Sequence, residues 1–205
     1  MILHEYALSS ASYRVRIALN LKGLEYRTRS YRLRADEQRA PEYLTINPAG
    51  LVPTLEIDGR FITQSLAIID YLDATHLEPR LIPRDPYERA RMLAMAHTIA
   101  CDLHPLNNLR VLKYLENEMG QAENARTTWY HYWVTQGLTA IESMISDRSE
   151  TPFIGGDLPG IADVCLVPQI FNARRFEFDL HPFPRLVSVS NRAAEHPAFR
   201  KAAPT

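Results

Sequence analysis

Two serine-containing segments of this sequence could hold an anion. Ser9-Ser10-Ala11 lies where a strand-like segment gives way to a helix, and Gln64-Ser65 immediately precedes a second apolar helical segment. Backbone N–H groups and the dipole at a helix N-terminus stabilise negative charge, although serines at such positions also act simply as helix caps. A hydrogen bond to a charged group contributes about 1.5–3 kcal/mol, enough to lower a thiol pKa from ~8.5 to ~7. The two segments suit a ligand with a thiolate at one end and a carboxylate at the other.

Two residues near these serines bear on the same chemistry. Tyr6, near the end of the first strand-like segment, is an alternative thiol-activating hydroxyl, but the serine turn is the better match. Val52-Pro53 lies between the two serine segments in the sequence. If this bond is cis, as ~5–6% of X-Pro bonds are, the N–H and C=O of Val52 could pair with an extended peptide.

The first eighty residues predict a small mixed β-sheet covered by helices. Asp58-Gly59 favours a hairpin turn because both residues accept the positive φ that such turns need. From periodicity we expect strands at 2–7, 26–31, 52–57 and 60–63, and helices at 13–21 and 65–74. Two parallel strands followed by a hairpin fit a thioredoxin-like topology.

Prolines mark the end of this domain. Pro79, Pro83 and Pro86 interrupt a stretch that can neither continue a helix nor pair in a sheet. Beyond them the apolar spacing is helical, with Asp85 expected to cap the first helix and Pro105 to kink it. The predicted organisation is a thioredoxin-like domain at 1–76, a linker at 77–86 and an all-α domain at 87–205.

The composition excludes several classes of function. The chain has 205 residues, 46% of them hydrophobic and 23% charged, which is typical of one large or two small globular domains. The 23 Lys and Arg residues nearly balance 24 Asp and Glu residues, so no overall field attracts nucleic acid or an anionic membrane. Neither a signal-peptide pattern nor a membrane-spanning run is present. We expect a cytoplasmic protein that binds neither nucleic acid nor membrane.

The cysteines and tryptophans carry no obvious chemistry. Cys101 and Cys165 lack the spacing of a metal site or a disulfide framework, so we expect buried, reduced thiols and no metal. Trp129 and Trp133 could stack on nucleotide bases, but their helical spacing puts both on one face and favours packing in the core.

Several segments together resemble the zeta class of glutathione transferases, over essentially the whole chain. They are Ser9 to Leu19, Asn47-Pro48, Val52 to Leu55, Gln64 to Ile69, Asp102 to Leu109, Ile161 to Gln169 and Ala173 to Phe176. Within that class the chain is most similar to the bacterial maleylacetoacetate and maleylpyruvate isomerases. The resemblance implies the glutathione transferase fold, a homodimer, and glutathione as cosubstrate.

The resemblance also implies roles for individual residues. Ser9 matches the serine that stabilises the glutathione thiolate, and Ser10 and Ala11 complete the loop around the sulfur. Gln64 and Ser65 match the pair that holds the γ-glutamyl end. The other implied glutathione contacts are Val52, Gln38 near the glycyl end, and the stretch that closes the cleft, namely Asp102, Leu103, His104, Asn108, Leu109 and Arg110.

The implied reaction is a glutathione-dependent cis–trans isomerisation of a maleyl keto-dicarboxylate. Arg175 matches the arginine that faces a substrate carboxylate, and Arg110 is a second candidate. The main expectation is maleylacetoacetate as substrate, in aromatic compound and amino-acid catabolism, with maleylpyruvate of gentisate breakdown as the alternative. A general conjugating or dehalogenating glutathione transferase, and a non-catalytic binding protein of this fold, stay open.

Three positions depart from the family pattern. Ala11 replaces a cysteine, which excludes a mechanism using that thiol, and Leu8 replaces an arginine that could contact a substrate carboxylate. Gly160 stands where the family commonly has Ser or Thr at a helix start, so it can cap only through its backbone freedom. These departures leave serine-based activation intact and bear mainly on the identity of the substrate.

Overall fold

The computed structural model describes residues 1–146 and 151–204. Its contacts divide the chain into two compact units: unit 1 is Met1–Ile82 together with the chain from Ala194 onward, and unit 2 is Pro83–Ala193. The all-α domain expected at 87–205 therefore differs from unit 2 at its C-terminal end.

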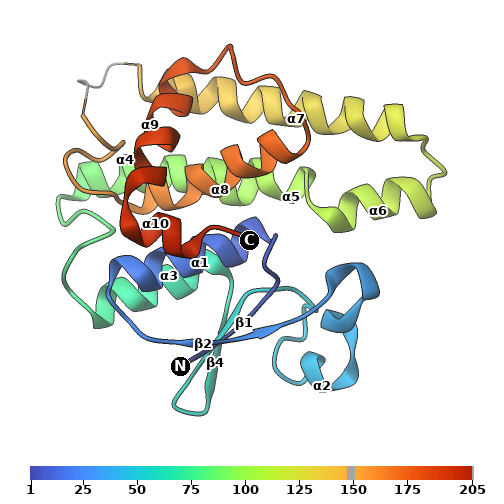
Figure 1. Ribbon diagram of the computed structural model, residues 1–205, viewed down its shortest axis with the longest axis horizontal. Helices are drawn as coiled ribbons and strands as arrows, with labels where there is room; N and C mark the ends of the chain where they lie inside the picture. The colour runs from blue at the N-terminus through green and yellow to red at the C-terminus, as the bar shows by residue number, and fades with distance from the viewer. Residues whose placement is uncertain (147–150, 205) are drawn as a thin grey trace. The chain divides into compact units, whose positions relative to one another are not determined.

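Unit 1 contains a four-stranded mixed sheet in the order β2-β1-β3-β4. Figure 1 labels β1, β2 and β4 of this sheet. The β1/β2 pair is parallel, and the β1/β3 and β3/β4 pairs are antiparallel. Asp58 and Gly59 both have positive φ, 50° and 72°, and form the predicted hairpin turn. The strands are β1 (Ile2–Glu5), β2 (Arg27–Ser30), β3 (Thr54–Ile57) and β4 (Arg60–Thr63). The predicted mixed sheet is confirmed.

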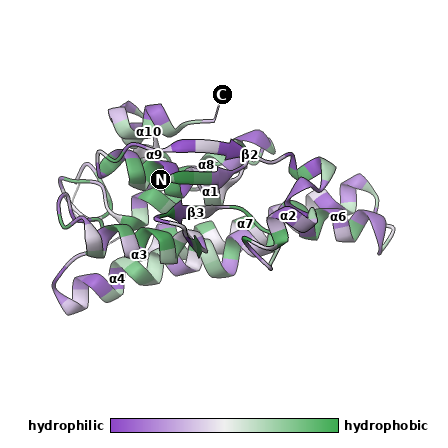
Figure 2. Cartoon of the chain, turned by 90° about the horizontal axis from the view of Figure 1, so that it is seen from below, coloured by the Kyte–Doolittle hydropathy of each residue, from purple (hydrophilic) through white to green (hydrophobic). Residues whose placement is uncertain are grey.

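Helices α1 (Ser10–Leu21) and α3 (Ser65–Thr75) pack against each other in this unit. Leu3, Val15, Leu55 and Ile68 are fully buried in the core, and each such side chain contributes about 1.5–3 kcal/mol through burial. At the sheet edge, all four residues of β2 are exposed, and Figure 2 shows this strand as hydrophilic. The remaining elements before β3 are the 3₁₀ turns η1 (Leu33–Ala35) and η2 (Glu37–Arg39) and the short helix α2 (Pro41–Leu44).

The last helix, α10 (Pro197–Ala202), belongs to unit 1 because it packs on α1. The Asn20 side-chain amide donates to the carbonyl of Ala198 at 3.0 Å. Arg16 Nε donates to the carbonyl of Ala202 at 2.8 Å. These contacts join residues 178 and 186 positions apart, which is why helical periodicity alone assigned this helix to the other domain.

Unit 2 is helical, as predicted. The Asp85 carboxylate caps its first helix by accepting from the N–H groups of Tyr87 and Glu88. Asp163 accepts from the Gly160 N–H at 2.9 Å, so a side chain completes the helix start where Gly160 has none to offer. The helices are α4 (Pro86–His97), α5 (His104–Leu106), α6 (Leu109–Asn117), α7 (Glu123–Met144), α8 (Ile161–Arg175) and α9 (Pro184–Glu195), which runs into unit 1.

Between α4 and α5 the backbone widens into a π-helical turn, η3 (Thr98–Leu103), just before Pro105. Such turns are rare and are frequent at functional sites. The turn packs closely on α7, since a Cβ at Gly137 would lie 2.8 Å from Leu103 Cδ2. Cys101 in this turn is exposed, which corrects the expectation that both cysteines are buried, whereas Cys165 is buried. Among the described residues, no helix has the length and apolarity needed to cross a membrane.

Candidate functional site

Ser9 is the N-cap of α1, with extended backbone angles of φ −72° and ψ 119°. Its Oγ accepts a hydrogen bond from the N–H of Ser12 at 3.2 Å, and its own N–H donates to the Tyr6 carbonyl at 2.9 Å. The cap uses only a lone pair of Oγ, so the hydroxyl proton can still be donated to a thiolate. Capping and thiolate stabilisation are therefore compatible in this one side chain.

Arg16 holds the loop that carries Ser9 through a hydrogen bond to its backbone. The Arg16 guanidinium pairs with the buried Glu5 carboxylate and donates through Nη2 to the Ala7 carbonyl at 2.9 Å. Ser10 is buried and Ala11 is half-buried at the first turn of α1. The ion-paired guanidinium of Arg16 thus fixes the loop at Ala7, two residues before Ser9.

The start of α3 is built differently. Gln64 is the N-cap, with φ of +67°, and its side chain makes no cap hydrogen bond. Ser65 is already inside the helix and is 6% exposed; its Oγ accepts from Arg14 Nη1 at 3.2 Å. The interpretation of Ser65 as a helix cap is therefore wrong, because a buried arginine from α1 holds its hydroxyl.

The turn around Gly50, two residues before Val52 in the sequence, approaches the backbone of Gln38. Gly50 has φ of +61°, and a Cβ there would lie 3.3 Å from the Gln38 carbonyl oxygen. Gln38 is 8% exposed, and its Nε2 donates to Asp36 Oδ1 at 3.3 Å. Only glycine allows this approach without displacing a neighbour.

The Val52-Pro53 bond is cis. The preceding Leu51 carbonyl is anchored by the Tyr43 hydroxyl at 2.6 Å and the Asn47 amide at 2.7 Å. By contrast, neither the N–H nor the C=O of Val52 is hydrogen-bonded to another residue within 1–146 and 151–204. Val52 can therefore pair with an extended ligand backbone.

In unit 2 the candidates Asp102, Leu103, His104, Asn108, Leu109 and Arg110 surround the π-helical turn and the start of α6. Asn108 Nδ2 lies 3.2 Å from His104 Nε2, and Asn108 Oδ1 accepts from the Arg110 N–H at 3.0 Å. Leu103 is only 2% exposed because its side chain packs toward Gly137. Leu109 is half-buried, whereas the Asp102 and Arg110 side chains are exposed. Leu103 is therefore a packing residue through its side chain.

Arg175 is the last residue of α8 and is exposed. The next residue, Phe176, stacks on Tyr130 with ring centroids 4.3 Å apart. Tyr130 donates its hydroxyl to Asn172 Oδ1 at 2.7 Å. Burial raises the pKa of Tyr130, and the positive charge of Arg175 partly opposes that rise. The end of α8 that carries Arg175 is therefore fixed against α7.

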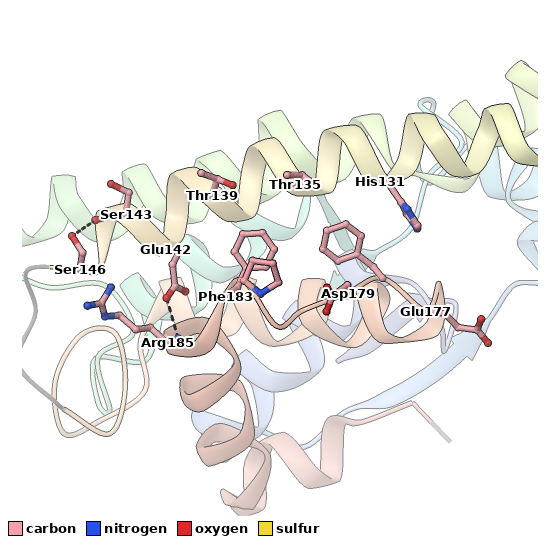
Figure 3. A pocket seen from close by; sticks show the side chains of 12 residues that line it. His131, Thr135, Thr139, Glu142, Ser143, Ser146, Glu177, Asp179, Phe183 and Arg185 are labelled. Atoms are coloured by element: carbon pink, nitrogen blue, oxygen red, sulfur yellow. Dashed lines mark hydrogen bonds between the residues drawn. The ribbon is translucent and has the colours of Figure 1, made fainter.

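Unit 2 also contains a groove of about 630 Å³ between α7 and the segment leading into α9 (Figure 3). Phe178 and Phe183 lie in it, and His131 meets Phe178 edge-on with ring centroids 5.3 Å apart. At one end, the Glu142 carboxylate accepts from the N–H groups of Arg185 and Leu186, both at 3.0 Å. None of the candidate residues lines this groove.

Sequence reasoning missed Arg14, which links α1 to the start of α3. The signal was present, because Arg14 and Arg16 interrupt the apolar spacing of a helix that is otherwise buried. A charged side chain in such a position is seldom buried without a specific bonding role.

The mixed sheet of unit 1 and the helices of unit 2 form the glutathione transferase fold. Residues 8–75 match the family described as the N-terminal domain of glutathione S-transferase. The chain is 46% identical over 203 residues to a maleylacetoacetate isomerase of Rhizobium meliloti (strain 1021), covering 99% of this chain and 95% of the relative.

Solved structures agree with this relationship. One is the holo structure of a maleylpyruvate isomerase, a bacterial zeta-class glutathione transferase, with TM-score 0.97, 39% identity and coverage of 100% of this chain and 97% of that one. Another is a maleylacetoacetate isomerase from Anaeromyxobacter dehalogenans 2CP-1 with dicarboxyethyl glutathione and citrate in its active site. Its TM-score is 0.87 and its identity 38%, covering 98% of this chain and 93% of that one. The chain belongs to the zeta-class glutathione transferase family that includes these isomerases.

Proposed function

We propose that this protein is a glutathione-dependent cis–trans isomerase of maleyl keto-dicarboxylates, with maleylacetoacetate as its main substrate. The observation that carries the proposal is Ser9 at the start of α1, whose Oγ is fixed by the Ser12 N–H. Its hydroxyl proton and the positive end of α1 can together stabilise the glutathione thiolate. The cosubstrate supplies the sulfur, so no cysteine of the protein takes part.

The reaction conserves atoms and electrons without any oxidant. The thiolate sulfur adds to the cis double bond, a C–S bond forms, and the π electrons move to the adjacent ketone oxygen as an enolate. The former double bond is now single and rotates. The enolate then re-forms the ketone, the C–S bond breaks, and the trans isomer and the thiolate leave. The dicarboxyethyl glutathione in the structure of a relative contains a comparable C–S bond to a dicarboxylate.

We assign a substrate carboxylate to Arg175, with Arg110 as a second candidate. Both side chains are exposed, and no hydrogen bond or ion pair engages the Arg175 guanidinium among the residues that the structure describes. A planar guanidinium binds a carboxylate through two parallel hydrogen bonds, which also orients the substrate for addition. The Tyr130 and Phe176 contacts at the end of α8 support this role by fixing the backbone beside Arg175.

We assign glutathione to the thioredoxin-like part of unit 1, close to the predicted 1–76, through Ser9, Ser10, Ala11, Gln38, Val52, Gln64 and Ser65. Residues 77–86 act as the linker, and unit 2 supplies the substrate arginines together with Asp102, His104, Asn108 and Leu109. We also propose a homodimer and a cytoplasmic location. Sedimentation of the purified protein at twice the monomer mass is the expected result for the dimer.

The test measures the loss of the maleylacetoacetate chromophore by the purified protein, with and without glutathione, beside maleylpyruvate. Rapid turnover that requires glutathione is expected, faster with maleylacetoacetate. Faster turnover of maleylpyruvate would instead favour the alternative substrate, to which Leu8 is relevant. No turnover of either substrate, despite glutathione binding, would contradict the isomerase and favour a general transferase.

Arg175→Ala separates the isomerase from a conjugating transferase of the same fold. Isomerase kcat/KM is expected to fall by about tenfold or more, since a charged hydrogen bond contributes about 1.5–3 kcal/mol. Conjugation of a neutral electrophile to glutathione should persist, because it needs Ser9 and no substrate carboxylate. Equal loss of both activities would mean that Arg175 supports the fold rather than the substrate.

A further inference from the structure

Arg14 is a buried cation on α1, only 1% exposed. A guanidinium stays protonated in proteins, and burying a charge is costly unless it makes specific hydrogen bonds. Its Nη1 donates to Ser65 Oγ at 3.2 Å, across 51 positions of the sequence. The charge is thus placed at the start of α3.

This contact determines what the Ser65 hydroxyl can do. Because Oγ accepts from Arg14, the Ser65 proton is left to donate to another group. Ser65 is also the first residue of an eleven-residue helix, where backbone N–H groups lack intrahelical partners and the dipole is positive. A hydroxyl donor, a helix start and a fixed cation coincide at one position, and all three favour a carboxylate.

We propose that Arg14 is a positioning residue that makes the start of α3 selective for the α-carboxylate of the γ-glutamyl group of glutathione. It acts through Ser65, which it orients, and through its charge, and it does not touch the ligand. This inference rests on the proposed function, since that function brings glutathione to unit 1.

Arg16 provides the comparison that isolates this role. It lies two residues further along α1 and is also buried, but its guanidinium pairs with Glu5 and donates to the carbonyls of Ala7 and Ala202. These bonds hold Glu5 and the backbone at Ala7 and Ala202 in place, rather than the Ser65 hydroxyl. Replacing Arg16 therefore tests the loss of a buried arginine without loss of the Ser65 contact.

The experiment compares two probes, glutathione and its analogue in which the γ-glutamyl α-carboxylate is a carboxamide. Titration calorimetry gives the Kd of each for the unmodified protein, Arg14→Met, Arg14→Lys, Ser65→Ala and Arg16→Lys. Thermal unfolding confirms that each variant is folded. Isomerase assays at saturating glutathione give kcat beside KM.

The unmodified protein is expected to bind the amide roughly ten- to a hundredfold more weakly than glutathione, since the amide loses a charge-assisted hydrogen bond. In Arg14→Met the Kd of glutathione should rise about tenfold while that of the amide changes little, so the ratio of the two falls. Ser65→Ala should lower this ratio to a similar extent. Arg14→Lys should give an intermediate ratio because it keeps the charge. Arg16→Lys should keep the full ratio of the unmodified protein. For Arg14 variants kcat should stay within about twofold.

Two results would overturn the inference. One is an unmodified protein that binds both probes equally, which needs no variant at all. The other is a folded Arg14 variant whose ratio is unchanged; if Arg14→Met does not fold, Arg14→Lys decides. Failure of the unmodified protein to bind glutathione would remove the proposed function as well, whereas glutathione-dependent isomerisation with an unchanged ratio would overturn this inference alone.

Discussion

The starts of α1 and α3 look alike in the sequence and differ in the structure. At α1, Ser9 lies outside the helix and its Oγ is held by the backbone N–H of Ser12. At α3, Ser65 lies inside the helix and its Oγ is held by the buried guanidinium of Arg14. A serine beside a helix start can thus be placed by the helix itself or by a distant charge.

The difference has a chemical consequence. The α1 start combines a hydroxyl donor with a helix dipole, which suits a soft thiolate that must remain reactive. The α3 start adds the Arg14 guanidinium that holds Ser65, which suits a carboxylate that only needs to be held. We therefore expect substitutions at the first to change the rate and substitutions at the second to change binding.

Ser9→Ala should have the largest effect on the reaction. Losing a hydrogen bond to the thiolate raises the pKa of the bound glutathione thiol by about 1–2 units. Turnover near neutral pH should fall roughly ten- to a hundredfold, and should recover partly as the pH rises and the thiolate re-forms. The thiolate absorbance of the glutathione complex, followed against pH, measures the pKa directly.

Ser9→Gly is the matched control for this variant. Glycine caps a helix nearly as well as serine, whereas alanine costs about 1 kcal/mol. Both variants should therefore show the same raised thiol pKa, while Ser9→Gly unfolds at a higher temperature than Ser9→Ala. If the thiol pKa is unchanged in both Ser9→Ala and Ser9→Gly, Ser9 acts only as a helix cap. The proposed contrast between a thiolate site at Ser9 and a carboxylate site at Ser65 would then be wrong.

Ser65→Ala should have a smaller and different effect. KM for glutathione is expected to rise about tenfold with kcat within about twofold, because the lost hydrogen bond is present equally in the ground state and the transition state. Initial rates over a wide range of glutathione concentration separate the two constants. A fall in kcat at unchanged KM would instead show that the start of α3, like the start of α1, affects the rate rather than glutathione binding.

Local patterns predicted the elements of the fold well. Asp58-Gly59 gave the hairpin turn, Asp85 gave the cap of α4, and Ser9 gave the cap of α1, all of which the structure confirms. Each depends on residues within a few positions of one another, so single-residue preferences for φ or for capping are sufficient.

Long-range contacts account for what the sequence did not predict. Arg14 meets Ser65 across 51 positions, and Arg16 meets Ala202 across 186. No periodicity encodes such a contact, and the general rule that arginines lie at the surface points the wrong way for both residues. The burial of Leu103 against Gly137 likewise depends on the approach of two helices rather than on either segment alone.

The exposed Arg32–Glu37 pair tests whether an arginine must be buried, as Arg14 is, to affect glutathione binding. We expect the smallest effect here. Arg32 has a side chain that is 80% exposed and donates through Nε to Glu37 Oε1 at 2.6 Å. The Arg32 N–H also donates to Glu37 Oε2 at 2.7 Å. Glu37 directly precedes Gln38, a predicted glutathione contact, in the sequence. The hydrogen bonds from Arg32 lower the pKa of Glu37.

Glu37→Gln should therefore change the Kd of glutathione by less than about twofold, since solvent and salt screen exposed ion pairs. The pKa of Glu37 is lowered, so the stabilising effect of its charged pair with Arg32 is fully present above the ordinary Glu pKa of about 4.3. That effect is lost only as the pH falls through the lower pKa of the folded protein. The Kd of glutathione for Glu37→Gln divided by its Kd for the unmodified protein, both measured by calorimetry, should stay constant between about pH 6 and 8. A tenfold effect would show that an exposed pair positions glutathione as strongly as the buried Arg14, and burial would no longer explain why α3 depends on a distant charge.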